Sequence, residues 1–407
     1  MKMLISGASV AGPALALWLG RAGHDVTVVE RAPSLREGGY AVDFRGEAQM
    51  ALLGRMGVLG DLGKLETGGG AMRFVDARNR TRLFLPAEFA GGDLEVRRAD
   101  LARVLYEHSK ADVRYIFGDS VRSLDQFPDR VEVAFETSPP QRYDFVFGAD
   151  GIHSNIRRLA FPGENFERDL GHYIASWDAP DLCVDTAETV CFNVPGRMIG
   201  IQPPGRDGAV PGVLALFASK ALDVDRHDSA RQKDILHGLF AGLGWRTPEL
   251  LAALGPADDL YFNTISRAKV PHWSKGRVAL VGDAAGGVSI GGMGTGAAIV
   301  AAYVLAGELL TDPGNHSRAF RRYQQLVEPF ADEGASNGEN SGKFLAPRTP
   351  WGLAFRNRFI SMPPVKASMI NIARKTGAAM DLPAYDLFPF DGAVDVSTLV
   401  VARRLSG

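Results

Sequence analysis

Apolar and polar positions near the N-terminus predict a strand, a helix and a second strand in close succession. Lys2 to Ser6 and Asp25 to Glu30 are mostly apolar runs of strand length. The residues between them begin with a glycine-rich turn and continue as an apolar helical stretch to about Arg21. A strand, a tight turn, a helix and a strand within roughly 30 residues form a βαβ unit, which implies a parallel sheet with a right-handed crossover.

The centre of the chain follows a different pattern. Short apolar runs between residues 68 and 95 alternate with Gly and Asn turns, which predicts hairpins. Segments between residues 166 and 265 have the lengths and turn residues of an antiparallel sheet. Helices are expected at Ser229 to Gly242 and at Pro248 to Leu254. From Gly276 a buried strand again runs into a glycine-rich turn, which leads to a helix.

These patterns predict an α/β fold class. A Rossmann-like nucleotide-binding domain would be interrupted by an α+β domain that has a mainly antiparallel sheet. The expected boundaries are 1–67, 97–165 and 266–345 for the nucleotide-binding domain, 68–96 and 166–265 for the α+β domain, and 346–407 for a C-terminal helical region.

The turn after the first strand is the first candidate site. Gly7 and Gly12 occupy the first and last glycine positions of a G-x-G-x-x-G pattern, and Ser9 stands at the middle one. The first glycine permits the tight turn, the middle position lets backbone approach a pyrophosphate, and the last permits close helix packing. Glu30 ends the second strand, where an acid suits the hydroxyls of an adenosine ribose. Together these features predict dinucleotide binding.

Two further motifs follow apolar strands. Asp150 and Ser154 belong to the sequence GADGIHSNIR, where the simplest interpretation is a capped helix start. Asp283 belongs to the sequence GDAA, and its carboxylate could cap a turn or accept hydrogen bonds from polyol hydroxyls. The amides of residues 294–296, at the start of the next helix, could direct a helix dipole at a ring that carries negative charge.

The composition narrows the classes of function. The 407 residues are 46% hydrophobic and 23% charged, with a net charge of −2. This is ordinary for a globular protein and lacks the basic surface typical of nucleic-acid binding. Cys183 and Cys191 are too few for a disulfide framework, so we expect a cytoplasmic protein. We expect no membrane association, because Ala297 to Leu310 is shorter than the roughly 20 residues that a span needs and is interpreted as a buried helix.

The order of the three motifs resembles the flavoprotein aromatic hydroxylases, which are single-component FAD monooxygenases of the para-hydroxybenzoate hydroxylase fold. The opening GASVAGPALALWLGRAGHDVTVVER is similar to that of tetracycline-modifying and antibiotic-tailoring members. The resemblance implies FAD as the cofactor, with Glu30 at its ribose and Asp283 at its ribityl chain. The residues expected to bind this cofactor are Gly7, Ser9, Val10, Ala11, Gly12, Glu30, Arg31, Arg45, Arg98, Asp150, Asp283, Gly294, Thr295 and Gly296.

Two of these assignments depend on position alone. Arg98 matches an arginine at a helix start that contacts FAD in the family. Arg45, with Asp43 near it, stands where relatives carry an arginine beside the flavin. The chain departs from the family after the third motif, where Gly286 and Ile290 replace the usual His and Pro. This departure concerns the flavin face, where the pyridine nucleotide and oxygen react, rather than the binding of FAD.

The resemblance implies an NAD(P)H-dependent monooxygenase. NADPH or NADH would reduce FAD transiently, O₂ would react at the flavin C4a position, and one oxygen atom would pass to an apolar, aromatic or polyketide-like small molecule. Because the flavin carries the chemistry, no catalytic triad and no metal site are expected. Candidate substrate contacts on the predicted sheet are Trp177, Phe192, Met198 and Phe217, with core packing as the alternative.

Several alternatives stay open at this level. His172, Tyr173 and Tyr261 are candidates for a base, although ordinary packing is the favoured interpretation of each. A dehydrogenase or oxidase on the same fold, or a non-catalytic FAD-binding protein, is a different function that the same motifs would allow. A flavin-dependent halogenase is disfavoured, because the sequence WDAP at residues 177–180 does not match the Trp-x-Trp-x-Ile-Pro motif of those relatives. The oligomeric state is not specified.

Overall fold

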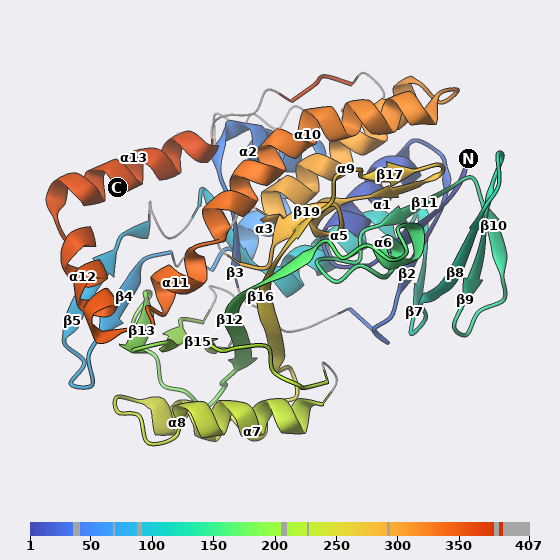
Figure 1. Cartoon of the computed structure of the whole chain (residues 1–407). Coiled ribbons are helices and arrows are strands. Elements are labelled where there is room, and N and C mark those ends of the chain that lie inside the picture. Colours follow the sequence, from blue (N-terminus) through green and yellow to red (C-terminus); the bar gives the residue numbers. More distant parts are fainter. Residues whose placement is uncertain are drawn as a thin grey trace.

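Two large sheets organise the molecule, and their helices cover them on the outer faces (Figure 1). The computed structural model describes residues 1–35, 41–67, 70–87, 92–204, 210–225, 228–290, 294–377 and 382–385. A six-stranded sheet carries the three sequence motifs, and an eight-stranded sheet lies beside it. The mixture of parallel and antiparallel sheets with packed helices confirms the predicted α/β class.

The six-stranded sheet is parallel except at one edge. β1 (Lys2–Ser6) pairs in parallel with β2 (Asp25–Glu30) and with β11 (Phe145–Gly148). β7 (Val113–Phe117) extends the sheet beyond β2, while β18 (Val278–Leu280) extends it beyond β11 and carries the short antiparallel edge strand β17 (Ser274–Lys275). The central strands are apolar on both faces, as expected when helices cover both sides of a parallel sheet. Their carboxyl ends deliver all three motifs to one edge.

Two apolar helices pack together against this sheet. α1 (Ala11–Arg21) is buried at every position except its last residue, and it contacts α9 (Gly294–Thr311). α10 (His316–Gly338) covers α9 from outside (Figure 1). α9 is longer than the sequence predicted, and its 18 residues are long and apolar enough to cross a membrane. Because 78% of them are buried inside the protein, α9 is a core helix, as expected from its sequence.

Smaller elements connect the sheet to its helices. α5 (Arg98–Ser109) follows β6 (Leu94–Arg97), and β6 pairs with β3 (Ala41–Phe44) in a two-stranded ribbon. α2 (Gly46–Arg55) and α3 (Leu59–Lys64) follow β3, and α6 (Asn155–Ala160) follows β11. A separate three-stranded antiparallel sheet consists of β8 (Val121–Gln126), β9 (Val131–Phe135) and β10 (Gln141–Tyr143).

The eight-stranded sheet has the order β19-β16-β12-β15-β14-β13-β4-β5. All its pairs are antiparallel except that of β13 with β4, which confirms the mainly antiparallel character predicted from the sequence. Its strands are β4 (Met72–Val75), β5 (Thr81–Leu85), β12 (Glu167–Asp178), β13 (Thr189–Val194), β14 (Arg197–Gln202), β15 (Gly212–Ala218), β16 (Tyr261–Lys269) and β19 (Gly286–Val288). The hairpin expected between residues 68 and 95 is therefore an edge of this sheet.

The two faces of the eight-stranded sheet pack against different partners. Side chains alternate between faces along each strand, so that Trp177 and Ser176 point in opposite directions. One face forms an apolar core with α7 (Ser229–Phe240) and α8 (Thr247–Leu254), which lie along the bottom of the molecule in Figure 1. The other face forms a second apolar cluster with residues of the C-terminal helices and with Ile290. We call this second face the inner face.

The C-terminal region contains helices up to Gly377, and the described residues 382–385 are not helical. α11 (Ser341–Leu345), α12 (Pro350–Ile360) and α13 (Pro363–Gly377) follow α10, and α12 lies beside β5 (Figure 1). α12 begins with a capped first turn, because the Thr349 hydroxyl accepts a hydrogen bond from the amide of Gly352 and Pro350 occupies the first helical position. Residues 378–381 and 386–407 lie outside the described residues.

Candidate functional site

The first turn requires glycine at two positions. Gly7 has a φ of 109°, and a β-carbon at this position would lie 2.5 Å from the carbonyl oxygen of Ala149. A β-carbon at Gly12 would lie 1.9 Å from the carbonyl oxygen of Gly7. Gly7 is thus required because the turn after β11 lies against it. Gly12 is required because α1 packs closely on the turn that precedes it. Both reasons agree with the roles predicted for a pyrophosphate-binding turn.

The N-terminus of α1 is available to an anion. Val10 occupies the N-cap and offers no side-chain hydrogen bond, and the first helical turn, which starts at Ala11, contains no acidic residue. The amides of an uncapped first turn, together with the helix dipole, favour a phosphate group. Ser9 stands beside this turn, and its hydroxyl accepts a hydrogen bond from Nε of Arg98 at 3.3 Å. The serine at the middle motif position therefore ties a cation from α5 to the turn.

Glu30 is fixed by backbone at the end of β2. Its carboxylate accepts hydrogen bonds of 2.9 Å from the amides of Ala8 and Ala32, so that one oxygen is held by the motif turn and the other by its own loop. This arrangement orients the carboxylate at the edge of the turn, where a ribose hydroxyl could donate to it. Arg31 next to it is exposed and lies at the same edge.

Asp150 caps the start of α6, as the simplest interpretation of its sequence predicted. Its carboxylate accepts hydrogen bonds from the amides of Asn155 and Ile156 at 2.8 and 3.1 Å and from the hydroxyl of Ser154. Burial raises the pKa of this carboxyl, and the hydrogen bonds from Ser154 and the backbone oppose that shift. A β-carbon at Gly7 would lie 2.9 Å from the Asp150 Cα, so the first and second motifs are in direct contact.

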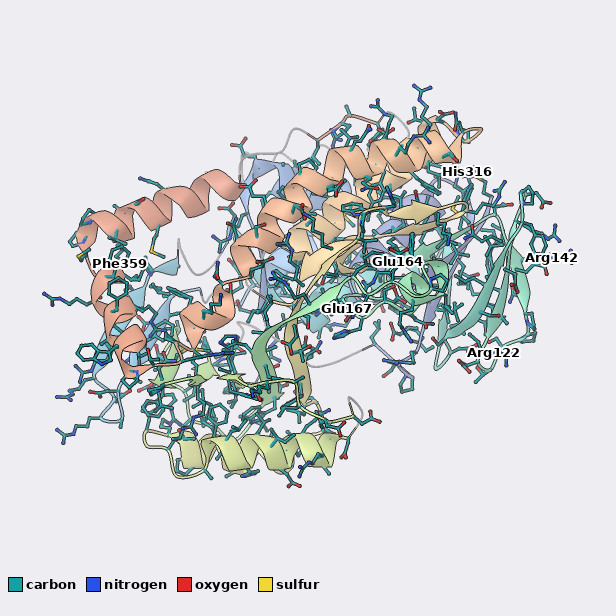
Figure 2. All side chains as sticks on the ribbon, in the orientation of Figure 1. Arg122, Arg142, Glu164, Glu167, His316 and Phe359 are labelled. Carbon is teal, nitrogen blue, oxygen red and sulfur yellow. The ribbon has the colours of Figure 1, made fainter. Side chains whose placement is uncertain are left out.

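Arg157 is a buried residue of the second motif for which the sequence pattern predicted no role. Its guanidinium donates to the carbonyl oxygens of Ile152 and Ala284 at 2.6 and 3.0 Å and to the carboxylate of Glu167. Only 3% of its surface is exposed. The same carboxylate contacts His153 Nδ1 at 2.6 Å. Arg157 therefore joins α6, the residue after Asp283, and the start of β12, where Figure 2 labels Glu167.

Asp283 lies in a 3₁₀ turn (Gly282–Ala284) directly after β18. The turn places its carboxylate so close to the following chain that a β-carbon at Gly287 would lie 2.2 Å from Oδ1, and one at Gly294 would lie 3.4 Å from it. Burial raises the pKa of the carboxyl, and the Arg98 guanidinium opposes this shift. No hydrogen bond to this carboxylate is made by the residues that the structure describes. A partly buried acceptor of this kind suits the hydroxyls of a polyol.

The third motif meets the first at the ends of α1 and α9. A β-carbon at Gly282 would lie 3.1 Å from the Ala11 Cβ and 3.3 Å from the Ala298 Cβ. A β-carbon at Gly296 would lie 2.3 Å from Oε1 of Gln49, a buried residue of α2. Thr295 is only partly buried at the start of α9. The N-terminal turns of both helices are therefore next to Asp283, and residues far apart in sequence converge at one edge of the six-stranded sheet.

Arg45 is anchored where the ribbon β3–β6 meets α2. It forms an ion pair with Asp43, and its amide donates to Oε1 of Gln49 at 3.0 Å. Gln49 thus touches both Arg45 and the start of α9, and it is a positioning residue that the sequence did not reveal.

Gly286 and Ile290, the two positions that depart from the family, follow Asp283 in the chain. Gly286 begins β19, which pairs with β16, and Ile290 packs partly buried against the inner face.

The predicted substrate contacts are not together. Trp177, Phe192 and Phe217 belong to the core shared with α7 and α8, and they are 2%, 5% and 0% exposed. Strand alternation directs these three side chains away from the inner face, and their burial favours the alternative of core packing. Met198 is also fully buried but lies in the inner-face cluster. A contact between any of the four residues and a substrate stays a prediction.

The three candidate bases also differ in position. Nδ1 of His172 is 3.2 Å from the Leu170 carbonyl oxygen, and burial lowers the pKa of its imidazole. The hydroxyl of Tyr173 accepts a hydrogen bond from the Leu222 amide on the opposite face, with its ring stacked on Phe217. Tyr261 is only partly buried and packs against the inner-face cluster. No group of three or more potential metal-ligating side chains occurs among the residues described.

Comparison with known proteins agrees with this geometry. Residues 1–318 match the family model described as FAD binding domain. The chain is 35% identical over 394 residues to a flavin-dependent monooxygenase from an unknown prokaryotic organism, covering 94% of this chain and 99% of the relative. It is also similar to the solved structure of the tetracycline destructase Tet(51), with 30% identity, a TM-score of 0.82, and coverage of 94% and 99%.

A more distant structure shows the same fold with the cofactor named. Klebsiella pneumoniae HpxO, complexed with FAD and uric acid, is 20% identical with a TM-score of 0.73 and coverage of 93% and 96%. The match to the family model, the share of each chain that is covered, and the convergence of the three motifs agree. The chain belongs to the FAD-binding-domain family and is a single-component, FAD-dependent monooxygenase.

Proposed function

We propose that this enzyme uses NADPH or NADH to insert one oxygen atom from O₂ into an apolar, aromatic or polyketide-like small molecule. The observation that carries the proposal is the convergence of the Gly7 turn, Asp283 and the start of α9, which would line a cofactor groove beside the inner face. Several of the relatives are flavin-dependent monooxygenases, and one structural relative is a tetracycline destructase. A cytoplasmic location is part of the proposal, since Cys183 and Cys191 are both free.

The residues of the groove would divide the cofactor between them. Gly7 to Gly12 and the uncapped start of α1 would hold the pyrophosphate, with Arg98 beside Ser9 adding positive charge. Glu30 would accept from the adenosine ribose, with Arg31 at the same edge. Asp283 would accept from the ribityl hydroxyls. In this proposal Asp150 acts indirectly, because its carboxylate is already occupied by the cap of α6.

The flavin side of the groove would be formed by Arg45 and the start of α9. Residues 294–296 place helix amides where a reduced flavin develops negative charge, and Arg45 is fixed beside them through Gln49. The bound flavin supplies the oxygen chemistry. The protein supplies binding, orientation and a dry apolar surface, which the inner face of the eight-stranded sheet provides.

The proposed function is tested by turnover of purified holoenzyme. Tetracycline and a panel of phenolic polyketides would be incubated with NADPH or NADH, while O₂ consumption and product mass are measured. Substrate-dependent O₂ use with a product that gains one oxygen atom is expected. Nucleotide oxidation without any oxygenated product would favour an oxidase, and a flavin that neither nucleotide reduces would favour a dehydrogenase with another electron donor or a non-catalytic protein.

The assignment of Asp283 has its own test. Asp283→Asn removes the charge that would accept from ribityl hydroxyls, so the purified variant is expected to retain less FAD per chain. Asp258 is exposed and has no role in the groove, so Asp258→Asn is the matched control. The ratio of flavin to protein absorbance measures both. Equal FAD content in the two variants would refute the proposed role of Asp283.

A further inference from the structure

A small polar cavity lies between β6 and the inner face of the eight-stranded sheet. Its volume is about 30 Å³, which accommodates about one water-sized group. Most of the side chains around it are polar, which is unusual beside an apolar inner face. They are Ala41, Thr67, Glu95, Arg97, Ser176, Trp177, Asp178, Thr189, Gln202, Pro203, Gly212 and Asp259.

The hydroxyl of Ser176 lacks a partner in this cavity. Ser176 is 4% exposed, and its Oγ has no hydrogen bond from the described residues. It belongs to the inner face, opposite Leu214 on one neighbouring strand and Tyr261 on the other. A buried hydroxyl without a partner costs free energy unless another group supplies the hydrogen bond. The cavity that Ser176 lines is the place from which such a group would reach it.

The charges around the cavity do not balance. Glu95, Asp178 and Asp259 contribute three carboxylates, and Arg97 is the one cation among the described lining residues. Nη2 of Arg97 is 3.4 Å from Oδ1 of Asp178 and 2.6 Å from the carbonyl oxygen of Val210. Asp259 is engaged by the Asp178 amide at 3.0 Å. An excess of negative charge therefore remains next to Ser176.

Glu95 brings this excess charge close to the flavin side of the groove. The Thr67 hydroxyl donates to its Oε1 at 2.6 Å, and β-ribbon pairing places it opposite Asp43, the partner of Arg45. Burial raises the pKa of the Glu95 carboxyl, and burial likewise raises the pKa of Asp178 despite the nearby Arg97. The neighbouring carboxylates of Asp43 and Asp259 add to these two shifts, while Arg45 and Arg97 oppose them.

We propose that this cavity is a substrate subsite that binds a protonated amine, with Glu95, Asp178 and Ser176 as its acceptors. The inference rests on the proposed function, because it names the polar group of the apolar substrate that the enzyme would oxygenate. A primary ammonium carries three hydrogen-bond donors and no acceptor. It fits a water-sized space, restores the charge balance and provides a donor for the buried hydroxyl. A carboxylate in the same space would meet like charges from three sides.

Isothermal titration calorimetry of the FAD-loaded enzyme tests this subsite with three phenols of matched ring and chain length. Tyramine carries the ammonium, 4-propylphenol is neutral, and 3-(4-hydroxyphenyl)propionate is anionic. Tyramine is expected to bind about ten-fold more tightly than 4-propylphenol, the factor that one charge-assisted hydrogen bond supplies. The anionic phenol is expected to bind most weakly.

Variants assign the effect to the cavity. Glu95→Gln and Asp178→Asn should each weaken tyramine binding about ten-fold while leaving 4-propylphenol unchanged, and Ser176→Ala should weaken tyramine about three-fold. Asp181 is exposed and does not line the cavity, so Asp181→Asn is the matched control and should change neither affinity. The neutral ligand also reports whether a variant has kept its fold.

Three outcomes would overturn the inference. The first is equal affinity for the three phenols, which a cavity that holds only ordered water would give. The second is equal weakening of tyramine and 4-propylphenol binding by the variants. The third is that none of the three phenols binds. The measurement is independent of turnover. If the phenols bind with the predicted affinities but neither pyridine nucleotide reduces the enzyme, only the proposed function is refuted. If the enzyme oxygenates a substrate but the predicted affinities are not found, only the amine subsite is refuted.

Discussion

Replacement of Gly12 by alanine should displace α1 and release FAD. The new β-carbon would lie 1.9 Å from the Gly7 carbonyl oxygen, whereas real β-carbons essentially never approach within 3.0 Å of such an atom. The helix or the turn must therefore move by at least about 1.1 Å. Because α1 is buried along almost its whole length, that movement disturbs its contacts with α9 and the sheet. Overpacking of this kind costs about 3 kcal/mol of the free energy of unfolding.

Gly60→Ala provides the matched control for this prediction. Gly60 lies in α3, and a β-carbon there would meet no atom within 4 Å. Alanine should stabilise this helix by up to about 1 kcal/mol. Urea unfolding and the ratio of flavin to protein absorbance are measured for both variants. If Gly12→Ala retains full FAD content and unfolds at the wild-type urea concentration, the packing argument for the first motif is refuted.

Three other side chains give predictions of different kinds. Arg157→Met should lower the free energy of unfolding by about 3 kcal/mol and weaken FAD retention, because it removes the buried cation beside Glu167 and the donor to two carbonyl oxygens. The exposed neighbour variant Arg158→Met should change neither property in the same urea and absorbance assays. Asp119 accepts three backbone hydrogen bonds that lower its pKa, so Asp119→Ala should cost about 2 kcal/mol at pH 7. A carboxyl whose pKa is lowered by folding stabilises the folded state at every pH above its pKa in the unfolded chain. The difference in free energy of unfolding between wild type and Asp119→Ala should therefore narrow as the pH falls below about 4. An equal difference in urea unfolding at pH 7 and pH 3 would contradict this prediction. Burial raises the pKa of the Cys191 thiol to about 12, so a thiol reagent at pH 8 should modify one cysteine, the exposed Cys183, in the native protein and both after denaturation.

The motif-bearing half of the fold was accessible from sequence because its signals are local. A buried strand, a glycine turn and an apolar helix follow one another within the βαβ unit, so β1, α1 and β2 are predicted almost to the residue. The acid at the end of β2 was likewise recognisable by its position. The convergence of Asp283 with the first motif was expected only from the family resemblance, because contact between residues 11 and 282 depends on tertiary packing.

Strand alternation assigns a side chain to one face of a sheet from sequence only when the other face is polar. The strand around Phe217 is apolar on both faces, since one face meets α7 and α8 and the other meets the inner-face cluster. The sequence therefore could not assign Phe217 to either face, and its size suggested a pocket. The strand around Trp177 does alternate, because His172, Ser176 and Asp178 occupy the positions between its apolar residues, so the direction of Trp177 was detectable.

Residues that act through other residues were missed for a related reason. Arg157 is charged and lies in a helix start, where sequence alone suggests a solvated surface position. Its burial depends on carbonyl oxygens from the second and third motifs and on Glu167 from β12. Gln49 is similar, because its contact with Arg45 and α9 requires the ribbon to be in place. Such positions emerge only from packing.

Anaerobic stopped-flow spectroscopy tests the central claim most directly. Holoenzyme would be mixed with NADPH or NADH, with and without a candidate substrate, and the reduced enzyme would then be mixed with isotope-labelled O₂. The account predicts that one of the nucleotides bleaches the flavin absorbance, that O₂ restores it, and that the substrate acquires one labelled oxygen atom. A bound flavin that neither nucleotide reduces, or that is reoxidised without label entering any substrate, would contradict the proposal that this enzyme is an NAD(P)H-dependent monooxygenase.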